Sequence, residues 1–400
     1  MAGDVTIALA LEGQLRLDDQ PALHQAVAVA RRHRSGRLLV LACRPETQRL
    51  RGAHQRRLEA QALASLQARL AAAAVPLLHF PQHTTAAALA AIRSLVIPAA
   101  VLHVRESRLF DDWPLAAATF PRVFSEFRRG LERSPEPPLP PPDLTGLGSA
   151  WDGLPPPDRV SLPAAHSDDP RSAFPFAGDE VSALARLQHY CFGSDGLRNY
   201  KATRNGLVGT EFSSKFSPFL AVGSLSVRRI WHELLRYQAL HGADEGSEWM
   251  KQELLWREFF LWSEQRHGAA FHAPGGIQNR RPDWVADRER FARWTRADSG
   301  HPLIDAQLNE LLATGYLSNR GRQWVASHFV NELRLPWIWG ARFFEWSLID
   351  AHPALNTGNW AYLAGVGSDP RSFGGTPRRF DLARQVDLYD PHERHRQRWS

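Results

Sequence analysis

The chain changes pattern once, from short apolar runs alternating with amphipathic stretches to an almost unbroken helical periodicity. In the first part we expect strands at Val5–Leu11, Arg37–Ala42, Val75–Phe80 and Ala100–Val104, and helices at Pro21–Arg32 and Ala53–Ala74. Strand and helix in alternation predict an α/β domain with a parallel sheet and helices on both faces. No glycine-rich phosphate loop follows the first strand, so the dinucleotide-binding Rossmann fingerprint is absent.

A proline-rich segment, Ser134–Pro163, separates the two patterns. Proline fixes φ and removes a backbone donor, so this segment predicts an extended linker. After residue 175 the apolar spacing is helical at Val181–Phe192, from Pro218–Leu220 onward, and at Val227–Leu240, Glu248–His267, Leu303–Thr314, Gly321–Asn331 and Gly340–Asp350. We therefore predict an α/β domain over 1–132, a linker over 133–175 and a larger all-α domain over 176–400.

Charge and cysteine content narrow the class of protein. The chain has 400 residues, a formal net charge of +6 and a sequence pI of 9.7, and its only lysines are Lys201, Lys215 and Lys251. Codon bias is one explanation for the preference for arginine over lysine, but it does not explain the excess of base over acid, which favours a nucleic-acid partner. Two cysteines, Cys43 and Cys191, exclude a disulfide framework and a four-cysteine metal site. No apolar run is long enough to span a membrane. We expect a soluble, cytoplasmic monomer without a metal site.

One short segment, Asp350–Tyr362, combines an acid, a histidine, two asparagines and a tryptophan within an otherwise apolar helical region. Buried polar groups without partners cost about 1–3 kcal/mol each. The segment therefore predicts either a dense internal network or a wall that faces a bound polar ligand. Asn356 and Trp360 are four residues apart and share a helix face.

Three further motifs carry hydrogen-bonding groups at helix starts or on one helix face. Ser213–Ser217 precedes Pro218, which predicts Ser217 as an N-cap and an anion-binding clasp, with an ordinary cap as the alternative. Glu253, Trp256 and Arg257 share a helix face. The alternative interpretation of this motif is a solvated ion pair beside a core tryptophan. The motif Ser318–Gln323 supplies the hydrogen-bond donors Asn319, Arg320 and Arg322, which suit phosphates or a carbonyl-rich heterocycle. The alternative is that the motif is only the basic start of a helix. Together they predict a large planar cofactor with phosphates and a basic face for nucleic acid.

Several strings in the second half resemble those of the photolyase/cryptochrome flavoproteins, and in particular their DASH-type branch. They are Thr203–Gly206, Ser213–Pro218, Glu253–Arg257, Ser318–Gln323, Gly358–Trp360 and Gly365–Arg371. The similarity extends over nearly the whole chain and is weaker in the first half. It implies an N-terminal antenna-type α/β domain and a helical domain that binds FAD.

The resemblance also implies roles for individual residues. The cofactor-binding positions would be Tyr200, Ser213, Ser214, Lys215, Phe216, Ser217, Glu253, Arg257, Asn319, Arg322, Asp350, His352 and Asn356, with Asp350 paired to Arg322. Damaged DNA would meet Arg204, Trp256, Arg320, Tyr362 and Arg378. The implied catalytic residues are Glu253, Trp256 and Asn356. Electrons would pass along Trp360, Trp337 and Trp284.

The implied activity is that of a DNA-repair lyase. Reduced FAD would absorb blue or near-ultraviolet light and pass an electron to a flipped-out cyclobutane pyrimidine dimer, with a preference for single strands, where flipping costs less. A blue-light receptor of the cryptochrome type is the alternative, and a binder of single-stranded nucleic acid without flavin is a third reading.

The chain departs from the family in three places. His352 stands where the family usually has a second aspartate beside the flavin, so we expect altered stability of the reduced flavin. The stretch Leu11–Arg16 differs from the usual early motif, and the linker is short and proline-rich. These last two differences leave open whether the antenna chromophore is a pterin, a deazaflavin or absent.

Overall fold

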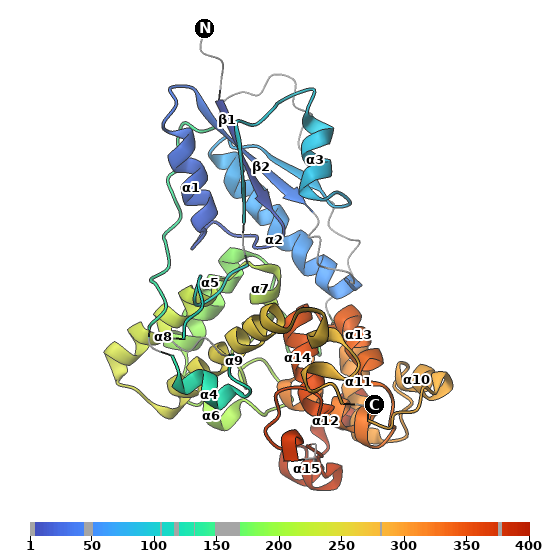
Figure 1. Ribbon diagram of the computed structural model, residues 1–400. Helices are drawn as coiled ribbons and strands as arrows, with labels where there is room; N and C mark the ends of the chain where they lie inside the picture. Colours follow the sequence, from blue (N-terminus) through green and yellow to red (C-terminus); the bar gives the residue numbers. More distant parts are fainter. Residues whose placement is uncertain are drawn as a thin grey trace.

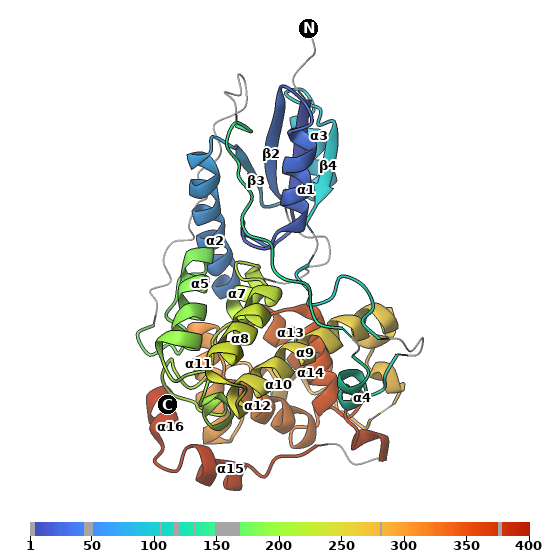
Figure 2. The same cartoon turned by 90° about the vertical axis from the view of Figure 1, so that its left-hand side faces the viewer.

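The computed structural model describes residues 5–43, 51–104, 106–115, 120–131, 133–148, 169–280, 282–374 and 378–400. An α/β region built on the sheet stands above a larger helical region (Figures 1 and 2). This arrangement confirms the predicted fold class. None of the described helices combines the length and the apolar composition needed to cross a membrane.

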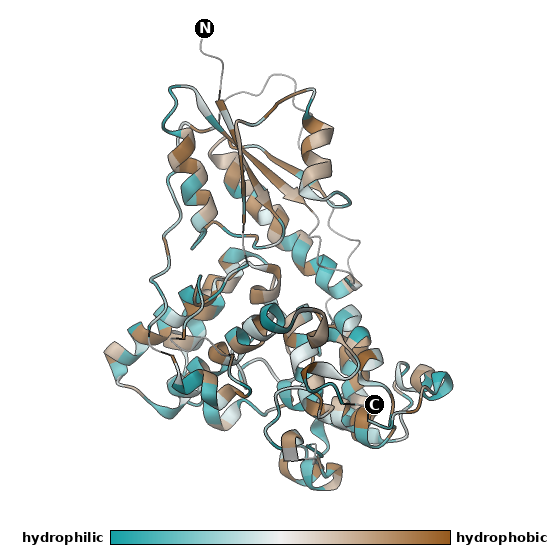
Figure 3. Cartoon of the chain, in the orientation of Figure 1, coloured by the Kyte–Doolittle hydropathy of each residue, from teal (hydrophilic) through white to brown (hydrophobic). Residues whose placement is uncertain are grey.

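The sheet consists of β1 (Val5–Leu11), β2 (Gly36–Cys43), β3 (Leu77–Phe80) and β4 (Ala100–His103) in the order β3-β2-β1-β4. Every pairing is parallel, and Ile7 lies opposite both Leu38 and Ala100. The strands are strongly hydrophobic along their length (Figure 3), as expected for a sheet covered on both faces.

Alternate residues of the strands pack against different helices. The side chains of Ile7, Leu9, Leu38 and Val40 join the core that includes residues of α1 (Pro21–Ala30) and α2 (Ala53–Ala72). The neighbouring residues of β1 and β2 pack with α3 (Thr85–Ile92) in a separate cluster. This alternation follows from the two-residue period of a strand, and it confirms the prediction of helices on both faces.

The helical region begins with α5 (Glu180–Gln188) and then runs through α6 (Tyr200–Thr203), α7 (Ser217–Val222), α8 (Val227–His241), α9 (Glu245–His267), α10 (Arg288–Trp294), α11 (Pro302–Thr314), α12 (Asn319–Asn331), α13 (Trp337–Ser347), α14 (Pro353–Leu363), α15 (Leu382–Tyr389) and α16 (Arg394–Trp399). The central helix α9 begins at a capping box made by Asp244 and Ser247. It packs against α6, α8 and α14, so it connects the segments that carry the predicted site residues.

Three predicted helices differ from the structure. The helix expected over Gly340–Asp350 instead spans Trp337–Ser347, because Pro336 starts it and extended backbone at Leu348 ends it. Asp350 therefore lies in the turn before α14. Ser217 is the first residue of α7 and not its N-cap; Phe216 holds the cap position and makes no side-chain cap bond. The predicted helix Val181–Phe192 ends at Gln188 and continues as a π-turn over His189–Gly193.

Buried ion pairs join the α/β region to the helical region. Arg228 of α8 donates to Asp19 at 2.8 Å, and neighbouring Arg229 donates to Asp18 at 2.6 Å. The helix α4 (Phe124–Arg129) lies on the helical side and packs against α9. Of the predicted linker Ser134–Pro163, the described part runs without helix or strand, and 149–163 lies outside the described residues.

Candidate functional site

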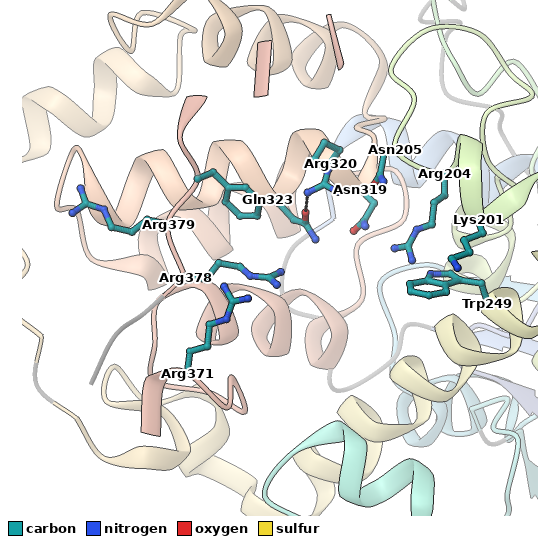
Figure 4. Close-up of a pocket in the computed structure, with 11 residues that line it drawn as sticks. Lys201, Arg204, Asn205, Trp249, Asn319, Arg320, Gln323, Arg371, Arg378 and Arg379 are labelled. Carbon is teal, nitrogen blue, oxygen red and sulfur yellow. Dashed lines mark hydrogen bonds between the residues drawn. The ribbon is translucent and has the colours of Figure 1, made fainter. Parts of the chain in front are cut away.

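A cavity of about 500 Å³ opens where α6, α9 and α12 meet the chain after α14. The described residues that line it carry cationic, amide and aromatic side chains and no carboxylate: Lys201, Arg204, Asn205, Trp249, Asn319, Arg320, Gln323, Arg371, Arg378, Arg379 and Phe380. In Figure 4, Lys201, Arg204 and Trp249 lie on one side, and Arg371 and Arg378 on the other. A cationic cavity of this kind suits a phosphate-bearing molecule.

The cations of this cavity differ in how far their charge is already compensated. Arg379 donates to Glu332 at 2.7 Å, and Lys201 lies 2.8 Å from Glu245. By contrast, no carboxylate among the described residues pairs with Arg320, Arg371 or Arg378. Arg320 instead donates to the side-chain oxygens of Asn205 and Gln323 at 2.9 and 3.0 Å. Three positive charges are thus left to attract an anion.

Glu253 adjoins the cavity through two of its lining residues. Arg204 lies 2.5 Å from Glu253 Oε1, and Trp249 Nε1 donates to the same oxygen at 3.1 Å. Burial raises the pKa of Glu253 above its ordinary value, although Arg204 opposes this shift. One turn further along α9, Trp256 stacks on Phe124 with ring centroids 3.9 Å apart.

Trp256 also meets Tyr362 of α14 edge to face, with centroids 6.0 Å apart. The structure therefore brings together the predicted dimer-pocket residues Glu253, Trp256 and Tyr362. The predicted DNA contacts Arg204, Arg320 and Arg378 all line the cavity.

The predicted clasp, Ser213–Ser217, surrounds a buried lysine. Lys215 has a φ of +62°, a conformation that residues with a side chain adopt rarely. Its Nζ donates to Tyr316 Oη at 2.8 Å, and burial lowers its pKa well below the ordinary value. The carbonyls of Ser213 and Ser214 accept hydrogen bonds from Arg186 at 3.1 Å. Arg186 thus contacts the backbone of the loop, and Tyr316 contacts its lysine.

Two other residues predicted to bind the cofactor are Tyr200 of α6 and Asn319 of α12. Tyr200 is buried at the start of α6, and burial raises the pKa of its phenol. Asn319 is exposed and lines the cationic cavity.

The segment from Asp350 to Trp360 contributes Asp350 to the predicted ion pair, and α12 contributes Arg322. Arg322 Nη2 donates to both carboxylate oxygens of Asp350 at 2.9 Å. The side chain of Asp350 is 2% exposed, against 27% for Arg322. Asn356 donates through Nδ2 to the carbonyl of Ala341 at 2.7 Å. This contact fixes the Asn356 amide group against α13.

Arg257 and His352 meet a residue that the sequence did not single out. Both lie against the same oxygen of Glu106, at 3.1 and 2.6 Å. Arg257 also donates to the carbonyl of Ser107 at 2.9 Å. These contacts cross from the helical region to the loop after β4. Nothing in the local sequence around Glu106 marks it, because its role depends on residues far away in the chain.

Two of the three predicted relay tryptophans are fully buried. Trp360 and Trp337 belong to one hydrophobic cluster, and Trp284 is half-buried and packs against it. Trp337 Nε1 donates to the carbonyl of Pro274 at 2.9 Å, whereas Trp360 Nε1 has no partner among the described residues. The order of electron transfer along them stays a prediction.

Other residues of the cavity were also missed at the level of sequence, among them Asn205, Trp249 and Arg371. Lys201 and Arg204 are three residues apart and could have been found as one basic helix face. Arg371 comes to the cavity through the turn after α14, which local sequence does not predict.

Comparison with known proteins identifies the class. Residues 249–400 match the FAD binding domain of DNA photolyase. The chain is 40% identical over 299 residues to a cryptochrome DASH of Synechocystis, a match that covers 72% of this chain and 59% of the relative. The chain thus spans about three fifths of the length of that curated relative.

Solved structures show the same likeness. A Synechocystis cryptochrome superposes with a TM-score of 0.86 at 31% identity, covering 100% of this chain and 89% of that one. A class III photolyase of Agrobacterium tumefaciens has the same fold, with a TM-score of 0.83 at 22% identity and coverage of 100% and 87%.

The fold and the matched domain define an FAD-binding flavoprotein. The chain belongs to the photolyase/cryptochrome family, and within it is similar to the cryptochrome DASH branch. Its residues suit FAD, because the Asp350 segment leaves His352 Nδ1 and Trp360 Nε1 buried without hydrogen-bond partners among the described residues.

Proposed function

We propose that this protein is a light-driven DNA photolyase that splits cyclobutane pyrimidine dimers. The observation that supports this function most directly is the position of Glu253, held by Arg204 at the edge of a cavity with three uncompensated arginines. When bound and reduced, FAD supplies the photoexcited electron for the reaction. The residues of the chain bind and orient the damaged strand.

The uncompensated cations Arg320, Arg371 and Arg378 bind the phosphates that flank the lesion. Such contacts position a nucleic acid without reading its sequence. Because the cavity is small, a dimer must leave the base stack to enter it. The unstacking cost is least in a single strand, which supports the proposal that single-stranded lesions are preferred.

Beside the cavity, Trp256 and Tyr362 are half-buried and supply aromatic surface against which a flipped pair of bases packs, while one face of Trp256 is stacked on Phe124. Glu253 supplies the hydrogen-bonding group. Burial raises its pKa although Arg204 opposes the shift, so the protonated form, which can donate to a carbonyl oxygen on which negative charge develops, is more accessible than in an ordinary glutamate.

The test is repair of dimer-containing oligonucleotides, single- and double-stranded, by protein with bound, chemically reduced FAD under blue light. We expect light-dependent repair, faster on single strands, with Glu253→Gln reducing the rate. The Glu393→Gln variant is the matched control, because Glu393 is an exposed partner of Arg396, which does not line the cavity. Absence of repair on both substrates would favour a blue-light receptor, a function that the buried Trp360 and Trp337 also support.

A further inference from the structure

Glu106 and His352 form a contact between two domains that are far apart in the sequence. His352 precedes the first turn of α14 and Glu106 follows β4, and their side chains meet at 2.6 Å across 246 positions. His352 is fixed to the helix by its own carbonyl, which accepts a hydrogen bond from the backbone N–H of Asn356 at 2.9 Å. The imidazole is therefore held at the start of the helix that carries Asn356 and Trp360.

The charge on Glu106 determines which nitrogen of His352 carries hydrogen. Burial alone would raise the pKa of Glu106, but His352, Arg257 and Arg108 lower it to about 2. Glu106 is thus a carboxylate near neutral pH, and a carboxylate only accepts hydrogen bonds. His352 must donate to it from Nε2–H. In the neutral imidazole, the other nitrogen, Nδ1, then presents a lone pair.

That second nitrogen is buried and has no hydrogen-bond partner among the described residues. A buried polar atom without a partner indicates a missing ligand or water. Other charged groups near the pair are Glu12, Arg51 and Glu59, which line a cavity of about 140 Å³ with it, and Glu258, which contacts Arg257. None of them forms a hydrogen bond with Nδ1.

We propose that Glu106 is a positioning residue that sets the tautomer of His352, so that Nδ1 accepts a hydrogen bond from an imide N–H of the cofactor. This inference rests on the function proposed above, because the ligand is the isoalloxazine of FAD, which carries one imide N–H between two carbonyls. Protonation of His352 turns Nδ1 from an acceptor into a donor, which then opposes the imide N–H. Acid therefore weakens the interaction through His352 itself.

Two measurements on the full-length protein test the inference. The ring ¹⁵N shifts of His352 report its tautomer without FAD, and flavin fluorescence reports FAD affinity across a pH series. We expect the Nε2–H tautomer in the wild type. We also expect FAD affinity to fall about tenfold on acidification, the change produced by loss of one hydrogen bond.

Variants separate the roles of the two residues. Glu106→Ala should lose the tautomer preference and weaken FAD binding at neutral pH. Glu106→Gln should weaken the tautomer preference, since its amide can accept through oxygen or donate through nitrogen, and should shift the pH transition downward because the negative charge is gone. His352→Asp should bind FAD without the pH-dependent change in affinity that an imidazole causes. His272→Ala is the control, because its contact with Glu264 at 2.9 Å is a surface His–Glu pair.

The outcomes distinguish this inference from the function on which it rests. A dominant Nδ1–H tautomer in the wild type, or the same pH profile in the wild type and His352→Asp, would overturn the inference while FAD binding stands. Failure of the wild type to bind FAD at any pH would overturn both. The expected profile with the control unchanged would support the role of Glu106.

Discussion

Arg322 Nη2 lies 2.9 Å from both carboxylate oxygens of Asp350, and only the arginine reaches solvent to any extent. Asp350 thus depends on Arg322 for its charge compensation. Removing one partner of a buried pair leaves an uncompensated charge and costs about 3–5 kcal/mol. Since Asp350 starts the segment that carries His352, Asn356 and Trp360, this pair links stability to the cofactor site.

We predict that Arg322→Ala lowers the free energy of unfolding by roughly 3 kcal/mol and weakens FAD retention, because the buried Asp350 carboxylate loses its partner. Urea unfolding and the fraction of flavin bound after gel filtration are the measurements. Arg334→Ala is the matched control: its pair with Asp283 is exposed and should contribute little. Equal losses in the two variants would contradict a special role for the Arg322–Asp350 pair.

The buried carboxyl group of Glu258 leads us to predict that the stability of the folded state falls as the pH rises. Glu258 is fully buried, and burial raises its pKa to about 7 although Arg257 opposes the shift. Between the ordinary glutamate pKa of ~4.3 and about 7, the folded state holds a proton that the unfolded state has lost. Stability contributed by this group is present below pH ~4.3 and is lost as the pH rises through that interval.

The variant Glu258→Gln should remove this loss, because its amide stays uncharged and can still accept from the backbone N–H of Leu109. Relative to the wild type, it should gain up to about 3 kcal/mol between pH 4 and pH 8. Thermal or urea unfolding across that range is the measurement. A constant difference between Glu258→Gln and the wild type at all pH values would rule out titration of Glu258 as the cause.

The uncompensated arginines predict how binding of single-stranded DNA depends on salt. Arg378→Ala should weaken binding of undamaged and damaged strands alike. It should reduce the slope of log affinity against log salt by about 0.7, the value for one phosphate contact on a single strand. Fluorescence anisotropy over a salt series measures both quantities. Arg379→Ala, which removes a cation already paired with Glu332, should change the slope less; the reverse order would contradict the assignment.

A variant of Trp360 can distinguish the supply of electrons to oxidised flavin from the repair reaction. Trp360→Phe should slow photoreduction of oxidised flavin strongly, because phenylalanine is much harder to oxidise, while repair by chemically reduced protein continues. Transient absorption measures the first and oligonucleotide repair the second. Trp324→Phe is the control for lost packing, since Trp324 is equally buried in the same cluster. Normal photoreduction in Trp360→Phe would remove it from the relay.

Much of the fold was predictable because local periodicity depends on which face of each element is buried. The four strands and most long helices were found within a few residues, as at β1 and α8. The errors lie at helix ends, as at α7 and α13, where proline and the packing of the following turn decide the boundary. Short helices such as α4 were missed, because a single turn has no clear period.

The sequence by itself determined the alternation that makes a parallel sheet, the helical second half and the motifs that place Asp350, Asn356 and Glu253 in one family of flavoproteins. Only the tertiary structure decided which charges are compensated. It paired Arg204 with Glu253, left Arg320, Arg371 and Arg378 facing a cavity, and brought Glu106 to His352. The physical reason is that ionic contacts depend on distance in space, and the residues that make them lie far apart along the chain.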